Sequence, residues 1–230
     1  MRRILSYLSL IFTTLFLAVL ALCVAPFDRK GEKVHAIARL WAKIGLAAAG
    51  ISASCEGLSL LPTPPFLLMA NHQSALDILT LLAAMPLSFR FIAKAELFRI
   101  PLFGRAIRKA GYISIDRENP REALKAMEEA VEKIREGTTV LIFPEGTRSP
   151  DGKLLPFMKG AFFLASRAAV PVVPLAIVGT NRLQPPGKAV PGRKGHVTVH
   201  VGRPIPPGGK DLPSKAGLME EVRRAIEGMM

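Results

Sequence analysis

The chain has 230 residues, 50% of them hydrophobic, and its 31 Lys and Arg against 18 Asp and Glu give a formal net charge of +13. This length suits one domain with an accessory segment and is enough to bury a sizeable core. A basic and apolar chain favours an anionic partner such as a membrane, a nucleic acid or a phosphate-bearing substrate. The two cysteines, Cys23 and Cys55, lack metal-ligand spacing, which argues against a disulfide framework and a zinc site.

The first predicted element is an apolar helix. Residues 4–27 contain no charged side chain, and as a helix they would extend about 36 Å, enough to cross a bilayer. Arg2 and Arg3 precede this segment, so a cleaved signal peptide is the alternative. The sequence around Cys23 is a poor cleavage site, and an uncleaved membrane anchor is therefore the favoured interpretation.

A second helix is predicted over residues 34–50, where apolar positions are mixed with Arg39 and Lys43. A tryptophan among basic residues, here Trp41, is typical of a helix that lies at a membrane interface. The two helices could form a hairpin that dips into one leaflet, or the first could span the bilayer while the second joins the core; the hairpin is favoured. Residues 1–51 are thus predicted to be a membrane anchor, and residues 52–230 an α/β domain.

In that domain, short apolar runs alternate with helical patterns. Strands are predicted at 66–70, 89–93, 112–116, 139–143, 172–178 and 197–201, and helices at 75–85, 102–110, 120–136, 160–168 and 213–229. This alternation predicts an α/β fold with a mostly parallel central sheet flanked by helices. Loops that follow parallel strands gather at one edge of the sheet, so the loops after residues 70, 116 and 143 should be neighbours.

The loop after the first of these strands carries Asn71-His72-x-x-x-x-Asp77. Histidine has an unperturbed pKa near neutrality. A carboxylate in the first helical turn could hold one ring nitrogen of His72 as a donor and leave the other free to take a proton. Ser74 is better used as a helix cap than as a nucleophile, so the hydroxyl to be activated would belong to a substrate. The alternative is structural, because Ser74-x-x-Asp77 also fits a capping pattern.

The next two loops carry charge. Arg117 ends the second loop and could bind a phosphate, or form a surface pair with Asp116. The third loop follows a tight, non-helical path that can expose backbone N–H groups to an anion, with a plain solvated turn as the alternative. Its candidate residues are Glu145, Gly146, Thr147 and Arg148.

Three further features are a lysine, a proline-bounded apolar run and a pair of histidines. Lys94 follows the strand at 89–93 and belongs to a basic face. The apolar run at 170–174 is bounded by prolines, which favours a structural role, although it could border an apolar substrate channel. His196 and His200 lie about 13 Å apart on one face of a strand, so they are interpreted as surface or sheet residues.

Taken in order, these loops resemble the conserved blocks of the glycerolipid acyltransferase superfamily. The His-x4-Asp block begins at His72, and residues 111–117, 143–148 and 170–174 resemble the second, third and fourth blocks. Within the superfamily, the short chain and N-terminal anchor look most like the 1-acyl-sn-glycerol-3-phosphate acyltransferases. The resemblance covers residues 66–174. It implies transfer of a fatty acyl group from acyl-CoA or acyl-carrier protein to the sn-2 hydroxyl of lysophosphatidic acid, giving phosphatidic acid.

The resemblance also implies roles for single residues. His72 is expected to be the general base and Asp77 its orienting partner. The acceptor site is expected to be lined by Arg117, Glu145, Gly146, Thr147 and Arg148, with Lys94 adding charge. Arg117 and Arg148 would contact phosphate, whereas Glu145 would orient an arginine or the glycerol hydroxyl. No metal or other cofactor is required.

The expected partners are lysophosphatidic acid, the acyl donor and anionic membrane lipid. The expected location is the inner membrane of the cell, with the active site on the cytoplasmic face where acyl donors are found. Alternatives are an acyltransferase for glycerol 3-phosphate, another lysophospholipid or a lyso-aminolipid, and a non-catalytic protein that binds anionic lipid. Nucleic-acid binding is disfavoured because aromatic and basic residues are not interleaved.

Overall fold

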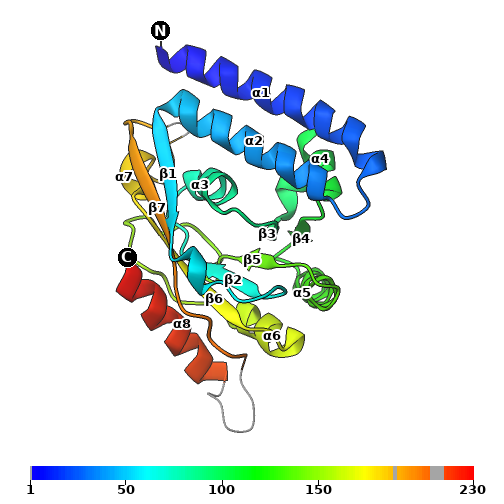
Figure 1. The fold of residues 1–230 in the computed structure, drawn as a ribbon, viewed down its shortest axis with the longest axis vertical. Coiled ribbons are helices and arrows are strands. Elements are labelled where there is room, and N and C mark those ends of the chain that lie inside the picture. The colour runs from blue at the N-terminus through cyan, green and yellow to red at the C-terminus, as the bar shows by residue number, and fades with distance from the viewer. Residues whose placement is uncertain (1, 189–190, 208–214) are drawn as a thin grey trace.

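The fold is a seven-stranded sheet between two sets of helices (Figure 1). The computed structural model describes residues 2–188, 191–207 and 215–230. The sheet order is β1-β7-β6-β2-β5-β3-β4, and every neighbouring pair is parallel except β6 and β7. The strands are β1 (Ile51–Glu56), β2 (Leu67–Ala70), β3 (Arg90–Lys94), β4 (Ile113–Ile115), β5 (Val140–Ile142), β6 (Val172–Val178) and β7 (Gly195–Val201). The predicted α/β class and mostly parallel sheet are confirmed.

The two faces of the sheet have separate cores. In β2, Leu68 and Ala70 join one core, whereas Leu67 packs with the other, because successive strand side chains point to opposite faces. The first core includes residues of α1, α2, α3 and α4, and the second includes residues of α5, α6 and α8. The helices are α1 (Arg2–Val24), α2 (Glu32–Ala49), α3 (Leu76–Ala84), α4 (Phe103–Lys109), α5 (Pro120–Arg135), α6 (Lys159–Ala168), α7 (Thr180–Leu183) and α8 (Lys215–Met229).

The predicted elements match these bounds to within two residues, except that the first helix ends at Val24 and not at residue 27. The short helix α7 was not predicted. The sequence interpretation missed β1, which lies at the edge of the sheet and pairs in parallel with β7. Its residues, Ile-Ser-Ala-Ser-Cys-Glu, include few large apolar side chains, so they give a weak strand signal. The predicted start of the last helix, at residue 213, lies outside the described residues.

Helices α1 and α2 form a hairpin that packs over α3 and α4 (Figure 1). Leu17, Ala18 and Ala21 of α1 are buried, and the indole of Trp41 donates a hydrogen bond of 2.9 Å to the Thr14 hydroxyl. At the turn, Gly31 has φ +72°, and a Cβ there would lie 2.9 Å from the carbonyl oxygen of Ala110. The two predicted helices thus form a hairpin, and the hydrogen bond of Trp41 links one to the other; the membrane contact predicted for this hairpin stays a prediction.

The described part of the chain contains no helix with the length and hydropathy needed to cross a membrane. The membrane-spanning helix expected over residues 4–27 is therefore not supported there. From residue 11 to the end of α1, some apolar side chains, such as Leu17 and Ala21, are buried against protein, whereas others, such as Phe12 and Phe16, are exposed.

Candidate active site

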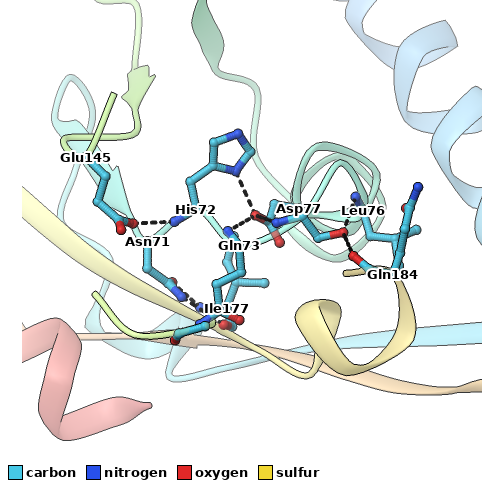
Figure 2. A network of polar contacts seen from close by, with 10 residues as sticks. Asn71, His72, Gln73, Leu76, Asp77, Glu145, Ile177 and Gln184 are labelled. Atoms are coloured by element: carbon cyan, nitrogen blue, oxygen red, sulfur yellow. Dashed lines mark hydrogen bonds and ion pairs between the residues drawn. The ribbon is translucent and has the colours of Figure 1, made fainter. Parts of the chain in front are cut away.

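His72 and Asp77 meet at the turn between β2 and α3, as the sequence predicted. Nδ1 of His72 lies 2.7 Å from Oδ2 of Asp77. The same oxygen accepts backbone N–H bonds from Gln73 (2.6 Å) and Ser74 (2.9 Å), and Asp77 is fully buried. Asp77 thus fixes the turn and orients the imidazole with one oxygen, so the two interpretations of this motif, structural and chemical, are compatible (Figure 2).

The imidazole of His72 is held with one nitrogen available. A carboxylate at Nδ1 requires that this nitrogen carry the proton, which leaves Nε2 as a hydrogen-bond acceptor. Figure 2 shows the second ring nitrogen turned away from Asp77. The ring stacks on Phe143 at a centroid distance of 4.0 Å and an interplanar angle of 17°. The site therefore presents an oriented, accessible base at the carboxyl edge of the sheet.

Ser74 is committed to the turn. Its hydroxyl accepts a 3.2 Å hydrogen bond from the backbone N–H of Leu76 and donates one of 2.8 Å to the carbonyl oxygen of Gln184. The side chain is fully buried. The N-cap of α3 is Ala75, which makes no side-chain cap hydrogen bond, so the prediction of Ser74 as the helix cap is wrong by one position. Its hydroxyl is instead used within the turn, and the residue is not placed as a nucleophile for His72.

Glu145 binds the backbone on both sides of the site. Its Oε1 accepts the N–H of His72 at 2.6 Å, and its Oε2 accepts the N–H of Leu155 at 2.7 Å. Burial raises the pKa of Glu145 above its usual value, while these two N–H bonds act in the opposite direction. The sequence interpretation expected the carboxylate to orient an arginine or the glycerol hydroxyl, but both of its oxygens are engaged by backbone amides.

The second and third loops are adjacent, as expected. Gly146 has φ +71°, and a Cβ at this position would collide with Sδ of Met158 and lie 3.4 Å from Nη1 of Arg117. Thr147 and Arg148 are exposed. In the described part of the chain, neither Arg117 nor Arg148 has a carboxylate within ion-pair distance. Two guanidinium groups are thus available close to the third loop.

Among the described residues, Lys94, unlike Arg117 and Arg148, is paired with a carboxylate. Its ammonium group forms an exposed 2.9 Å ion pair with Glu96, and this pairing raises the pKa of Lys94. His196 and His200 lie elsewhere, on β7, where His196 bonds the hydroxyls of Ser52 and Ser54 and His200 pairs with Glu56. The interpretation of both histidines as sheet or surface residues is confirmed.

An apolar pocket shares Phe143 with the surroundings of His72. It lies between α5 and α6 and the ends of β4 and β5, with a volume of about 370 Å³. Phe143, on which His72 stacks, is part of its wall, as is Arg117. Ile115, Leu124, Met127 and Phe163 supply much of the apolar surface. Sequence reasoning missed this pocket, because its residues come from segments with no common motif.

Asn71 secures the strand that carries the base. Its side-chain amide donates to the carbonyl oxygen of Ile177 (3.0 Å), and its Oδ1 accepts the N–H of Ile177 (2.7 Å). The carboxyl ends of β2 and β6 are thereby locked together. The sequence placed Asn71 in the first motif without a role, and its position directly after a buried strand was the available signal.

Comparisons with known proteins identify the family of the chain. The family model described as Acyltransferase matches residues 52–178. A chloroplastic 1-acyl-sn-glycerol-3-phosphate acyltransferase of Brassica napus is 39% identical over 89% of this chain and 58% of its own length. The crystal structure of the 1-acyl-sn-glycerophosphate (LPA) acyltransferase PlsC from Thermotoga maritima is 31% identical, with a TM-score of 0.78 over 100% of this chain and 98% of that one.

The chain belongs to the 1-acyl-sn-glycerol-3-phosphate acyltransferase family. The mouse 1-acyl-sn-glycerol-3-phosphate acyltransferase alpha is 36% identical over 71% of this chain and 58% of its own length. The chain thus spans a little over half the length of these two curated relatives. The resemblance inferred from residues 66–174 is confirmed, and the matched region contains His72, Asp77 and the third loop.

Proposed function

We propose that this protein transfers a fatty acyl group from acyl-CoA or acyl-carrier protein to the sn-2 hydroxyl of lysophosphatidic acid, giving phosphatidic acid. The observation that carries the proposal is the His72–Asp77 pair, with the second ring nitrogen of His72 available beside an apolar pocket. A base without a neighbouring protein nucleophile suits a reaction in which the substrate supplies the hydroxyl. The family membership gives this chemistry its substrate class.

In the proposed mechanism, Nε2 of His72 takes the proton of the acceptor hydroxyl as its oxygen attacks the thioester carbonyl carbon. The ester C–O bond forms and the C–S bond breaks. The imidazolium returns its proton to the leaving thiolate, so the histidine ends the cycle neutral. The carboxylate of Asp77 stabilises the imidazolium while it exists. No acyl-enzyme is formed, consistent with the engagement of Ser74 in the turn.

The two substrates fit different parts of the site. The apolar pocket beside Phe143 is suited to the acyl chain of the donor, which would bring the thioester to His72. Arg117 and Arg148 are suited to the phosphate of the acceptor, because a guanidinium binds phosphate oxygens in bidentate fashion. Gly146 and Arg117 also line the pocket, so the proposed phosphate and acyl-chain sites are adjacent.

The test is thiol release from acyl-CoA donors of graded chain length, with lysophosphatidic acid, glycerol 3-phosphate and a neutral lysolipid as acceptors. Release that requires lysophosphatidic acid and declines once the chain exceeds the pocket would support the proposal. Release with another acceptor alone would retain the chemistry and overturn the substrate. Failure with every acceptor, repeated with acyl-carrier-protein donors, would contradict an acyltransferase activity.

Arg148→Ala is expected to raise KM for lysophosphatidic acid about 10- to 100-fold, the scale of losing a hydrogen bond to a charged group. The variant should act on an acceptor without phosphate much as the wild type does. Steady-state kinetics with both acceptors measure the difference. Equal losses on the two acceptors would show that Arg148 has a structural role.

We also propose that the hairpin binds the membrane surface from one side. Ile11, Phe12, Leu15, Phe16, Val19 and Leu20 of α1 are all exposed. Their spacing places them on one face of the helix, opposite the face buried against the protein. An exposed apolar stripe on a basic chain is suited to an anionic lipid surface. A location at the inner membrane, facing the cytoplasm, would place this surface where acyl donors are available.

Replacing both Phe12 and Phe16 with serine is expected to reduce co-flotation with anionic lipid vesicles about tenfold, because it removes two apolar rings that are 70% and 59% exposed. Turnover of detergent-dispersed substrates should change little. Leu60→Ser, at an exposed residue outside the hairpin, is the control. Unchanged flotation of the double variant would contradict membrane binding through α1.

A further inference from the structure

The C-terminal helix reaches the candidate active site through one arginine. Arg223 of α8 donates from Nη1 to the carbonyl oxygen of Leu155 at 2.9 Å, and from Nη2 to the carbonyl oxygen of Leu154 at 3.1 Å. A planar guanidinium presents its donors in a fixed fork, which suits two successive carbonyl groups. One side chain thereby fixes the path of the segment that follows the third loop.

Leu155 is held from two directions. Its carbonyl oxygen accepts from Arg223, and its N–H donates to Oε2 of Glu145 at 2.7 Å. The other oxygen of Glu145 accepts the N–H of His72 at 2.6 Å. A continuous series of hydrogen bonds therefore runs from α8, through the backbone of Leu155 and the carboxylate of Glu145, to the backbone of His72.

Arg223 is itself well positioned for this contact. Its guanidinium pairs with Glu227 one helical turn later at 2.8 Å and lies 5.6 Å from the ring centroid of Phe157. Helix α8 is anchored by Val222 and Ile226, which are completely buried in the core that includes α5 and α6. The arginine thus extends from a helix that is anchored in the core. A small shift of α8 would be enough to break the hydrogen bond from Arg223 to Leu155.

The carboxylate of Glu145 depends on both backbone partners. The side chain is only 5% exposed, and a buried carboxylate oxygen left without a donor is costly. If residues 154 and 155 move away, Oε2 loses its N–H partner, and the carboxylate is free to rotate or to bind water. Oε1 then no longer holds the His72 amide in one place. A base displaced by as little as 1 Å can lose a large part of its effect.

We propose that Arg223 is a positioning residue that holds His72 in place through Leu155 and Glu145. The proposal rests on the proposed role of His72 as the general base. Arg223 lies outside residues 52–178, the region matched by the family model, and far along the chain from the motifs. It touches neither substrate nor reacting atoms, so its effect should appear in turnover and in local order, and hardly in substrate binding.

Arg223→Gln tests this, because glutamine keeps a polar side chain of moderate length and loses the two-carbonyl fork. We expect kcat to fall about tenfold with little change in KM for the acceptor. Arg223→Lys, which can bond one carbonyl, should recover part of the loss. Arg224→Gln is the matched control: it makes the same charge change on the same helix, at a largely exposed side chain whose ion-pair distance to Glu220 is 3.8 Å.

Hydrogen exchange supplies a readout that does not depend on activity. In Arg223→Gln, the amides of His72 and Leu155 should exchange at least tenfold faster, while those of β6 and α8 keep their protection; Arg224→Gln should match the wild type. Faster exchange throughout β6 and α8 with no preference for these two amides would show general destabilisation and overturn the proposal. So would unchanged exchange and kcat in Arg223→Gln, or a Lys variant as impaired as the Gln variant.

Failure of this proposal is distinguishable from failure of the proposed function. An inactive wild type would contradict the acyltransferase reaction, and the exchange rates would still report whether Arg223 orders His72. An active wild type with an unaffected Arg223→Gln would leave the reaction standing and remove the role of Arg223. If the Gln variant does not fold, Arg223→Lys and Arg224→Gln carry the same comparison.

Discussion

His72→Ala is expected to lower kcat by about 10²–10⁴-fold, the range of general-base catalysis. Among the described residues beside His72, neither carboxylate is placed to substitute, because Asp77 is fully buried and both oxygens of Glu145 are bound by backbone amides. The thioester is cleaved only if the attacking hydroxyl loses its proton as the bond forms. KM for either substrate should change little, since neither the arginines nor the pocket depends on the ring.

Thiol-release kinetics with lysophosphatidic acid measure this effect, and a thermal melt shows whether the variant is folded. His196→Ala is the matched control, because His196 is an exposed histidine on β7 whose ring bonds only hydroxyls of β1. It should retain full turnover. If His72→Ala retained near-normal turnover while folded, the general-base role would be wrong even though the family membership would stand.

The contact between His72 and Asp77 could be predicted from the sequence because its geometry is local. His72 and Asp77 are separated by five residues across a strand-to-helix turn, and the turn fixes the distance between them. The strands other than β1 could also be predicted from the sequence, since buried apolar runs such as the one in β2 leave few alternatives. The neighbouring loops followed from the rule that parallel strands end at one edge of a sheet.

The contacts of Glu145 could not be predicted in the same way. Its partner His72 lies 73 residues earlier, and Arg223 lies 68 residues after Leu155. A backbone N–H carries no sequence signal, so a carboxylate that binds two of them looks like any acidic residue in a loop. The sequence therefore suggested an arginine or a substrate hydroxyl as the partner of Glu145, and gave no signal for the amides of His72 and Leu155.

The surroundings of the N-terminal helix could not be predicted from its sequence, for a different reason. An apolar run of helical length indicates that side chains avoid water, but it does not distinguish lipid from protein as their surroundings. In the structure, Leu17, Ala18 and Ala21 face α2 and α4, while Phe12 and Phe16 remain exposed. The apolar character of the whole segment does not distinguish the two faces of the helix. Only the packing in the structure shows that one face contacts protein and the other is exposed.

Asp77→Asn should also lower kcat by about 10²–10⁴-fold, although it changes the shape of the side chain little. The amide oxygen can take the place of Oδ2 and accept the N–H bonds of Gln73 and Ser74. The amide nitrogen then takes the place of Oδ1, which has no hydrogen-bond partner among the described residues. The fold of the turn is retained, but a neutral amide cannot stabilise the imidazolium that forms when His72 takes the proton.

Asp77→Ala separates this electrostatic effect from the structural one. It leaves two buried backbone N–H groups without their acceptor, which costs about 1–3 kcal/mol each, so its melting temperature should fall well below that of Asp77→Asn. The double variant His72→Ala/Asp77→Asn should be hardly slower than His72→Ala, because residues that act as one unit are not additive. Losses that multiplied in the double variant would show that Asp77 contributes independently of His72, and would contradict the proposal that Asp77 acts by stabilising the imidazolium of His72.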